Sequence, residues 1–266
     1  MSSMILIPAG PFVMGLSKHE VKRICRRFDI KSALLVDTMP PKKPGESVDD
    51  KPSFRNQTRF PIDASGQPPL WAQKELELPD FYIDKYPVTN AEFYAYVIEA
   101  NVDWIYNKYN PVPKDCERLP AVNVTYQMAE GYAAWTGKRL PTEQEWEKAA
   151  RGRFAMLFPW GGVWHSERLS CSVSTQGSLS PVDSHPMGSS PYGVMDMAGN
   201  VWEWTSASRD EAMVIKGGSF RESKPYQFIC AFKAFEEKNS ARDNIGFRCV
   251  IDMPLSPRAN ARTNAL

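Results

Sequence analysis

The C-terminal half of the chain carries no helical period, and this feature constrains the fold more than any other. From Gly152 onward, short apolar runs alternate with glycine, serine, proline and aromatic residues, as in FPWGG, SPYGVMDMAGNVWEWTS, AMVIKGGSF and NIGFRCVID. This half is therefore predicted to consist of irregular loops and short antiparallel strands. The chain also has 22 prolines and 31 aromatic residues (13 Phe, 10 Tyr and 8 Trp) in 266, which argues against a bundle of long helices.

Helices are predicted in the N-terminal half, where capping residues mark two of their starts. Thr89 precedes Glu92 by three residues, and Thr142 precedes Glu145 in the same way. Each pair is a capping box, so one helix is expected over residues 91–100 and another from Thr142 through Gly152. The other predicted elements are a strand and turn over residues 4–15, a basic amphipathic helix over 18–35, a strand over 76–88 and a helix over 125–138.

The chain is predicted to form a single domain over residues 1–266. Residues 37–73 are rich in Pro, Lys, Asp, Ser and Gly, so we expect residues 16–75 to be an insertion, and residues 252–266 a mobile tail. With 32 Lys and Arg against 31 Asp and Glu, the net charge is +1, which gives no electrostatic reason to expect a nucleic-acid or membrane partner. Without a signal peptide or membrane span, and with five scattered cysteines, a cytoplasmic location is predicted.

One spaced set of oxygen donors stands out once common motifs are excluded. The chain has no GxxxxGK[ST], no GxGxxG, no HExxH and no GxSxG. A carboxylate, two backbone carbonyls and a second carboxylate, spaced over eight residues, can wrap a hard cation such as Ca²⁺. These donors are Asp196, Gly199, Val201 and Glu203. The alternative is that the two carboxylates cap turns and pair with Arg248 or Lys216.

Nine motifs occur in an order that is known from one family. They are PAGPFVMG (8–15), FYIDKYPVTN (81–90), PAVNV (120–124), WTGKRLPTE (135–143), EWE (145–147), FPWG (158–161), YGVMDMAGNVWEW (192–204), KGGSF (216–220) and IGFRC (245–249). Together they resemble the formylglycine-generating enzyme family, also called sulfatase-modifying factor domains. The resemblance implies an α+β, C-type-lectin-like fold with little regular secondary structure. It also implies a structural Ca²⁺ on the Asp196 set.

The resemblance leaves the chain without the family's catalytic cysteines. Formylglycine formation uses two cysteines that follow the Gly-Gly-Ser-aromatic motif, bind Cu(I) and activate O₂. The first aligns with Glu222, and the second falls in a short deletion around Tyr226 and Gln227. Because a carboxylate is a poor substitute for a soft thiolate toward Cu(I), we expect neither copper nor formylglycine formation.

Two other cysteines, Cys230 and Cys249, match positions that form disulfides in secreted relatives. The positions of their partners are Ala133 and Ala150 here. Both cysteines are therefore expected to be reduced, buried and apolar in character.

The leading functional hypothesis is a binding or accessory module that holds a protein, peptide or small molecule in the groove of the former catalytic face. The predicted floor of this groove is Trp202, Ser219, Phe220, Glu222, Tyr226, Phe228 and Phe232. One alternative is an oxidoreductase that uses another metal or Glu222, with Ser219 beside it. Another is a retroelement-diversified variable protein with variable segment 221–244, although the Lys, Glu and Gln content of that segment argues against it. Related ergothioneine-type sulfoxide synthases need an N-terminal histidine-bearing iron domain, so this chain is not expected to be one.

Overall fold

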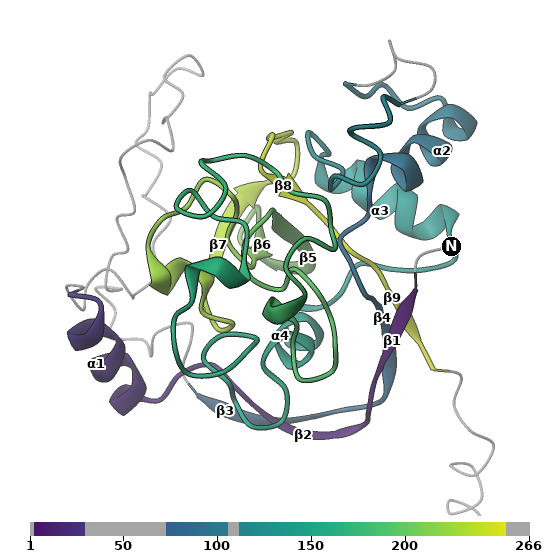
Figure 1. Ribbon diagram of the computed structural model, residues 1–266. Helices are drawn as coiled ribbons and strands as arrows, with labels where there is room; N and C mark the ends of the chain where they lie inside the picture. The colour runs from purple at the N-terminus through teal and green to yellow at the C-terminus, as the bar shows by residue number, and fades with distance from the viewer. Residues whose placement is uncertain (1–2, 30–72, 106–111, 254–266) are drawn as a thin grey trace, which may run out of the picture.

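The computed structural model describes residues 3–29, 73–105 and 112–253, and in them the predicted α+β fold is confirmed (Figure 1). Long irregular segments separate the regular elements, as the sequence predicts. The helices are α1 (Lys18–Arg27), α2 (Asn90–Ala100), α3 (Tyr126–Trp135) and α4 (Glu143–Arg151), with short 3-10 turns η2 (Ser166–Arg168), η3 (Pro186–Gly188) and η4 (Pro225–Phe228). The strands are β1 (Met4–Ile7), β2 (Gly10–Met14), β3 (Lys74–Leu78), β4 (Phe81–Asp84), β5 (Trp202–Arg209), β6 (Ala212–Lys216), β7 (Lys233–Glu237), β8 (Ile245–Gly246) and β9 (Val250–Asp252).

The strands form three small sheets. One has the order β1-β4-β9, a second pairs β2 with β3, and the third has the order β7-β6-β5-β8. The first sheet joins the two ends of the described chain, because β4 pairs with the first strand on one side and the last strand on the other (Figure 1). Among the described strands all pairings are antiparallel except β5–β8, which is parallel. The predicted antiparallel pairing is therefore wrong for β5 and β8.

Each of the two long strands predicted near the N-terminus is divided in the structure. The segment 4–15 contains β1 and β2, and the segment 76–88 contains the end of β3 and all of β4. Pro8 and Pro79 lie at the two breaks. Proline has no backbone N–H to donate to a strand ladder, which explains why a strand ends there.

The capping residues identified in the sequence start their helices as predicted. Thr89 with Glu92, and Thr142 with Glu145, form complete capping boxes. A third box, Ser17 with Glu20, starts α1 and was missed in the sequence analysis. Helix α1 ends at Arg27 rather than at residue 35, and residues 30–35 lie outside the described part. None of the described helices is long and apolar enough to span a bilayer.

The predicted insertion and tail fall largely on residues that the structure does not describe. Residues 30–72 of the 16–75 segment and residues 254–266 of the tail lie outside it. The described part of the segment includes Leu16, which is buried in the core, helix α1 and the first residues of β3. The C-terminal boundary of the predicted insertion thus falls inside β3.

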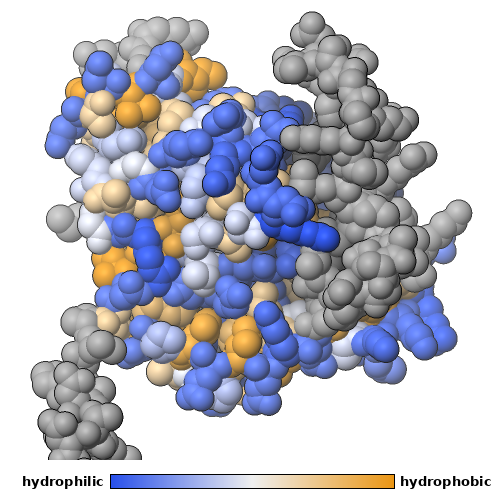
Figure 2. All heavy atoms as spheres, turned by 180° about the vertical axis from the view of Figure 1, so that it is seen from behind, coloured by the Kyte–Doolittle hydropathy of each residue, from blue (hydrophilic) through white to orange (hydrophobic). Residues whose placement is uncertain are grey.

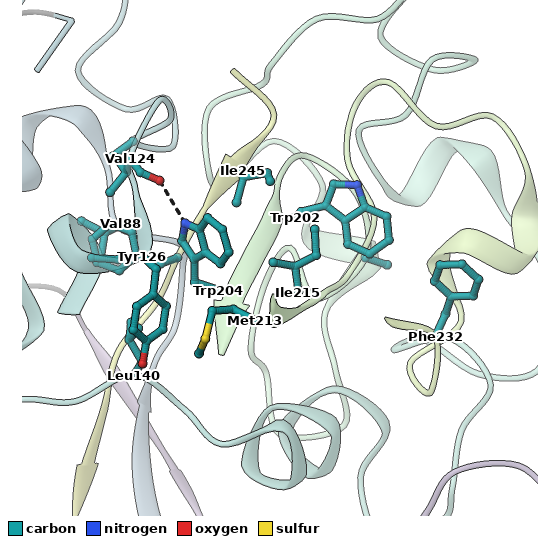
Figure 3. Packing of buried hydrophobic residues seen from close by; sticks show 14 of the residues in the cluster. Val88, Val124, Tyr126, Leu140, Trp202, Trp204, Met213, Ile215, Phe232 and Ile245 are labelled. Carbon is teal, nitrogen blue, oxygen red and sulfur yellow. Dashed lines mark hydrogen bonds between the residues drawn. The ribbon is translucent and has the colours of Figure 1, made fainter. Parts of the chain in front are cut away.

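Aromatic residues dominate the buried core, in keeping with the composition. The larger cluster contains Trp202, Trp204 and Ile215 from β5 and β6 together with residues of α2 and α3 (Figure 3). The indole of Trp204 donates to the Val124 carbonyl at 3.0 Å, so its polar atom is satisfied inside the core. A second cluster packs Trp146 of α4 against β1, β4 and β9. The Trp146 indole also donates to Glu203 of β5 at 2.7 Å, so a residue of the second cluster contacts the start of that strand.

Candidate functional site

Three of the predicted site residues, Trp202, Ser219 and Glu222, form one hydrogen-bonded cluster, which we call the Glu222 cluster. The indole Nε1 of Trp202 donates to Glu222 Oε1 at 3.1 Å. The backbone N–H of Ser219 donates to Glu222 Oε2 at 2.7 Å, and the Ser219 hydroxyl donates to the same oxygen. The two candidate catalytic residues of the sequence analysis are therefore in direct contact.

Two glycines that follow β6 bring Ser219 to Glu222. Gly217 and Gly218 have φ angles of 100° and 75°, in the region that glycine adopts without strain. A Cβ on Gly218 would lie 2.6 Å from the Phe228 ring, so a larger residue would collide there. Backbone conformation and close packing thus explain why the Gly-Gly-Ser sequence stands at this turn.

The surroundings of Glu222 favour its neutral form and hold it in place. Burial raises the pKa of the carboxyl, and the hydrogen bonds from Ser219 and Trp202 oppose this rise only in part. The Ser219 hydroxyl also accepts from Asn244 Nδ2 at 3.2 Å, and Ser219 is fully buried. Ser219 therefore positions Glu222. A carboxyl of this kind can exchange a proton or bind a hard cation, but it is a poor ligand for Cu(I).

The predicted groove floor is almost entirely buried. Of its seven residues, only Glu222 reaches solvent, and the other six are at most 7 % exposed. Three of its aromatic members pack on one another, with ring centroids 6.1 Å apart between Trp202 and Phe232 and 5.9 Å apart between Tyr226 and Phe232. Burying aromatic area in this way stabilises the fold. The structure thus differs from the expected open floor, and ligand binding by these residues stays a prediction.

Three of the four predicted cation donors lie on a loop with several left-handed residues, and the fourth, Glu203, lies at the start of β5. Asp196, Gly199 and Asn200 have φ angles of 55°, 80° and 64°. Such a coil can turn side-chain and carbonyl oxygens toward one point. The Asp196 carboxylate is buried, and its hydrogen bond from Asn200 is long, at 3.4 Å. Burial raises the pKa of Asp196 to about 7, although Arg248 and Asn200 oppose the shift.

Glu203, the second carboxylate of this set, already has strong partners. Arg248 Nε and Nη2 each donate to it at 2.7 Å, and Trp146 Nε1 donates at 2.7 Å. The alternative pairing with Arg248 is therefore confirmed, while Lys216 pairs with Glu147 instead. A carboxylate accepts about four hydrogen bonds, so Glu203 keeps one acceptor position.

A hard cation at this donor set would have the weakly bonded Asp196 carboxylate as its main ligand, because Glu203 already accepts three hydrogen bonds. Across the described residues there is no group of three or more His, Cys, Asp or Glu side chains that could hold a metal. A site here would depend on two carboxylates and the Gly199 and Val201 carbonyls. Bound Ca²⁺ would supply positive charge to the buried Asp196 carboxylate. The calcium site stays a prediction.

A model of the sulfatase-modifying factor enzyme 1-like domain matches residues 1–253. The chain belongs to this family. Among its curated relatives, the inactive Cα-formylglycine-generating enzyme 2 of Mus musculus is 30 % identical over 74 % of this chain and 82 % of the relative. Hercynine oxygenase of Mycolicibacterium smegmatis is 35 % identical over 50 % of this chain and 38 % of that protein.

The family fold is also found among solved structures. PvdO from Pseudomonas aeruginosa has a TM-score of 0.60 and 25 % identity to this chain, covering 93 % of each chain. The predicted C-type-lectin-like fold of formylglycine-generating enzymes is thereby confirmed. The alignment of Glu222 with the family's first catalytic cysteine stays a prediction from the sequence.

Among the described cysteines of this sulfatase-modifying factor domain, Cys230 and Cys249 are not reactive thiols. All are free of disulfides, and Cys171, Cys230 and Cys249 are buried. Burial raises the pKa of Cys230 to about 12 and also raises the pKa of Cys249, so neither thiol ionises readily. The prediction of reduced, buried cysteines is confirmed for both. Cys249 shares one core cluster with Ala133, and Cys230 shares the other with Ala150.

Sequence reasoning missed two features of the site's surroundings. Asn244, which holds the Ser219 hydroxyl, directly precedes the IGFRC motif, and that position is its only sequence signal. The second feature is a buried network of Glu147, Arg151 and Lys216. Glu147 and Arg151 are four residues apart on α4, a spacing that could have indicated their pairing, whereas Lys216 lies 69 residues from Glu147 and gives no spacing signal.

Proposed function

We propose that this chain is a member of the sulfatase-modifying factor family that makes no formylglycine and acts as a binding or accessory module. One observation carries the proposal: Glu222 aligns with the first catalytic cysteine, and its carboxylate is bound by Ser219 and Trp202. Cu(I) requires soft sulfur ligands, which carboxylates do not replace. The second cysteine position, around Tyr226 and Gln227, lies in η4 and also lacks a thiol.

Two further observations support this role. The relative that covers much of the chain at 30 % identity is itself named an inactive formylglycine-generating enzyme. The framework around the site is intact, including the Gly217-Gly218 turn and the packed aromatic residues beneath it. A fold that is kept while its thiols are lost is suited to presenting a surface to a partner. We also propose a reducing, cytoplasmic compartment, which free Cys230 and Cys249 support.

The test is an oxidase assay on the purified full chain. The chain is incubated with copper, O₂, a thiol reductant and a peptide that carries a sulfatase-type cysteine motif, and aldehyde is measured by mass spectrometry. An active formylglycine-generating enzyme assayed in parallel controls for the reagents. We expect no aldehyde from this chain at any copper concentration. Robust aldehyde formation would refute the proposal.

A second candidate function is an oxidoreductase that uses Glu222 and a metal other than copper. The partly exposed Glu222 carboxyl, with its raised pKa at the family's catalytic position, favours this candidate. Similarity to hercynine oxygenase over half of the chain also supports it. Metal analysis of the purified protein separates the two candidates. Stoichiometric iron that is lost in Glu222→Gln supports an enzyme, whereas calcium alone, or no metal, supports a binding module.

A further inference from the structure

Helix α1 carries a dense group of basic side chains on the surface that faces away from the core. Lys18, Lys22, Arg23, Arg26 and Arg27 are all exposed, and Glu20 is the one acidic residue of the helix. His19 lies among them and is also exposed. We call Lys18, His19, Lys22, Arg23, Arg26 and Arg27 the α1 basic face. In Figure 1 the helix lies at the edge of the molecule.

The opposite side of α1 is fixed to the body of the protein. Ile24 is 1 % exposed and belongs to the large core cluster, against which Val21, Cys25 and Phe28 also pack. At the C-terminal end of the helix, Arg27 Nη1 donates to the Gly162 carbonyl at 3.0 Å. The helix therefore presents its basic side chains from a fixed position. This lowers the entropic cost of binding a partner, because the helix backbone is already ordered.

The basic side chains of α1 lack acidic partners in the described part of the chain. The ion pairs found there involve none of the five. Lys18, Lys22 and Arg26 follow one another at intervals of four residues, so they lie on one side of the helix about 6 Å apart. Like charges at this spacing repel one another. A bound anion would relieve that repulsion, and the arginines suit carboxylate oxygens particularly well.

The charge of the remaining chain favours a short anion over a long one. The helix holds five of the 32 basic residues and one of the 31 acidic residues, so the rest has 27 basic and 30 acidic residues and a net charge of −3. A nucleic acid extends beyond a ten-residue helix, which is about 15 Å long, and would meet this negative body. Figure 2 shows hydrophilic side chains over much of the rear face, without one continuous apolar surface.

A lipid surface fits α1 less well than a short acidic segment does. Membrane-binding amphipathic helices insert their apolar side between lipids. Here that side is buried, since Ile24 belongs to the core cluster. An anionic bilayer would also bring its charge close to the net negative remainder of the chain. A short run of carboxylates, by contrast, needs no more than the length of the helix.

We propose that the α1 basic face docks an acidic segment of a partner protein. This inference rests on the proposed binding role and specifies the class of partner that the module takes. The acidic segment lies along α1 and exchanges ion pairs with the rows of Lys and Arg side chains. Docking at α1 leaves the Glu222 cluster uninvolved, so the two sites can be tested separately.

The test measures binding of a dye-labelled ten-residue polyglutamate peptide to the full chain by fluorescence anisotropy at about 50 mM salt, where surface charges are weakly screened. The variant Lys22→Gln/Arg23→Gln/Arg26→Gln removes three charges from the α1 basic face. The matched control Lys114→Gln/Lys224→Gln/Lys238→Gln removes three exposed charges elsewhere. Three surface ion pairs of ordinary strength correspond to about a tenfold or greater loss of affinity for the α1 variant. We expect less than about a twofold loss for the control.

Equal losses in the two variants, or no peptide binding at low salt, would overturn the inference. Tighter α1-dependent binding of a ten-nucleotide single strand, or of phosphatidylserine vesicles, would also overturn it and would assign the helix to that partner. Circular-dichroism melts establish that both variants fold. Aldehyde formation would refute the proposed function whatever the peptide does, while failure of peptide binding alone leaves the absence of oxidase activity unchanged.

Discussion

Replacing Glu147 by glutamine should destabilise the protein strongly, because this carboxylate neutralises two buried cations. Glu147 Oε1 accepts from Arg151 Nη1 at 3.0 Å and from the Gly15 N–H at 2.7 Å, while Oε2 accepts from Lys216 Nζ at 3.0 Å. All three charged side chains are at most 1 % exposed. Removing one partner from such a buried set costs about 3–5 kcal/mol.

The structure indicates which of the two cations causes most of this cost. Arg151 also donates to the carbonyls of Gly15, Ala155 and Met156, so it keeps partners in the variant. Among the described residues, the other contact of the Lys216 ammonium is the face of Trp146, 5.6 Å from the ring centroid, so in the variant its charge has no buried anion to balance it. Adding Lys216→Met to Glu147→Gln should therefore recover part of the lost stability.

Urea unfolding at neutral pH measures the stability lost in Glu147→Gln and the part recovered by adding Lys216→Met. In a thermal melt, the melting temperature of Glu147→Gln should fall by about 10 °C. Asp243→Asn is the control, because it breaks the exposed Arg221–Asp243 pair and should cost less than about 1 kcal/mol. If Glu147→Gln lowers the free energy of unfolding no more than Asp243→Asn does, the buried charges do not stabilise the fold as described.

The same carboxylate predicts a pH dependence of stability. Burial would raise the pKa of Glu147, but Lys216 and Arg151 together hold it below its ordinary value. A carboxyl whose pKa is lowered by folding stabilises the protein above its unfolded pKa, near 4.5, and this contribution is lost as the pH falls through the folded pKa. The wild type should therefore lose stability in acid more steeply than Glu147→Gln, as seen in urea titrations between neutral pH and pH 3.

Three further predictions concern the metal, the core and the turn. If Ca²⁺ is bound, EGTA should lower the melting temperature, and Asp196→Ala should abolish that effect; an unchanged melt would show that the site is empty. Ala150→Cys should form a disulfide with Cys230 on oxidation. Because the disulfide closes a loop of about 80 residues, it should raise the free energy of unfolding by up to about 4 kcal/mol, and a reductant should remove this gain. Gly218→Ala should cost about 1–3 kcal/mol in urea unfolding, whereas Gly162→Ala, with ordinary φ and open space, should cost under about 1 kcal/mol.

The sequence predicts those parts of the fold that local chemistry determines. The capping boxes at Thr89 and Thr142 start helices because each needs only residues three positions apart. The irregular texture after Gly152 likewise follows from local composition. The parallel pairing of β5 with β8 could not be predicted, because it joins Trp202 to Ile245 across 43 residues and leaves no periodic signal.

The sequence predicts which residues form the candidate site, but it does not predict that most of their side chains are buried. The motifs correctly bring Trp202, Ser219 and Glu222 into one cluster. They do not reveal that Phe228 and Phe232 pack inward, because an aromatic residue in a loop has the same identity whether it lines a groove or fills a core. The partner of Glu203 was one of two open alternatives, and only the structure selects Arg248 over Lys216.

The β1-β4-β9 sheet has a consequence for how the protein is made. Strand β4 pairs on one edge with β1, which precedes it in the sequence, and on the other edge with residues 250–252 near the end of the described chain. During synthesis on the ribosome, most of the polypeptide must emerge before that edge is covered. Until then the nascent chain exposes unpaired backbone N–H and C=O groups to neighbouring molecules. Strand β9 thus closes the sheet, and truncation just before it should yield aggregates rather than a smaller folded protein.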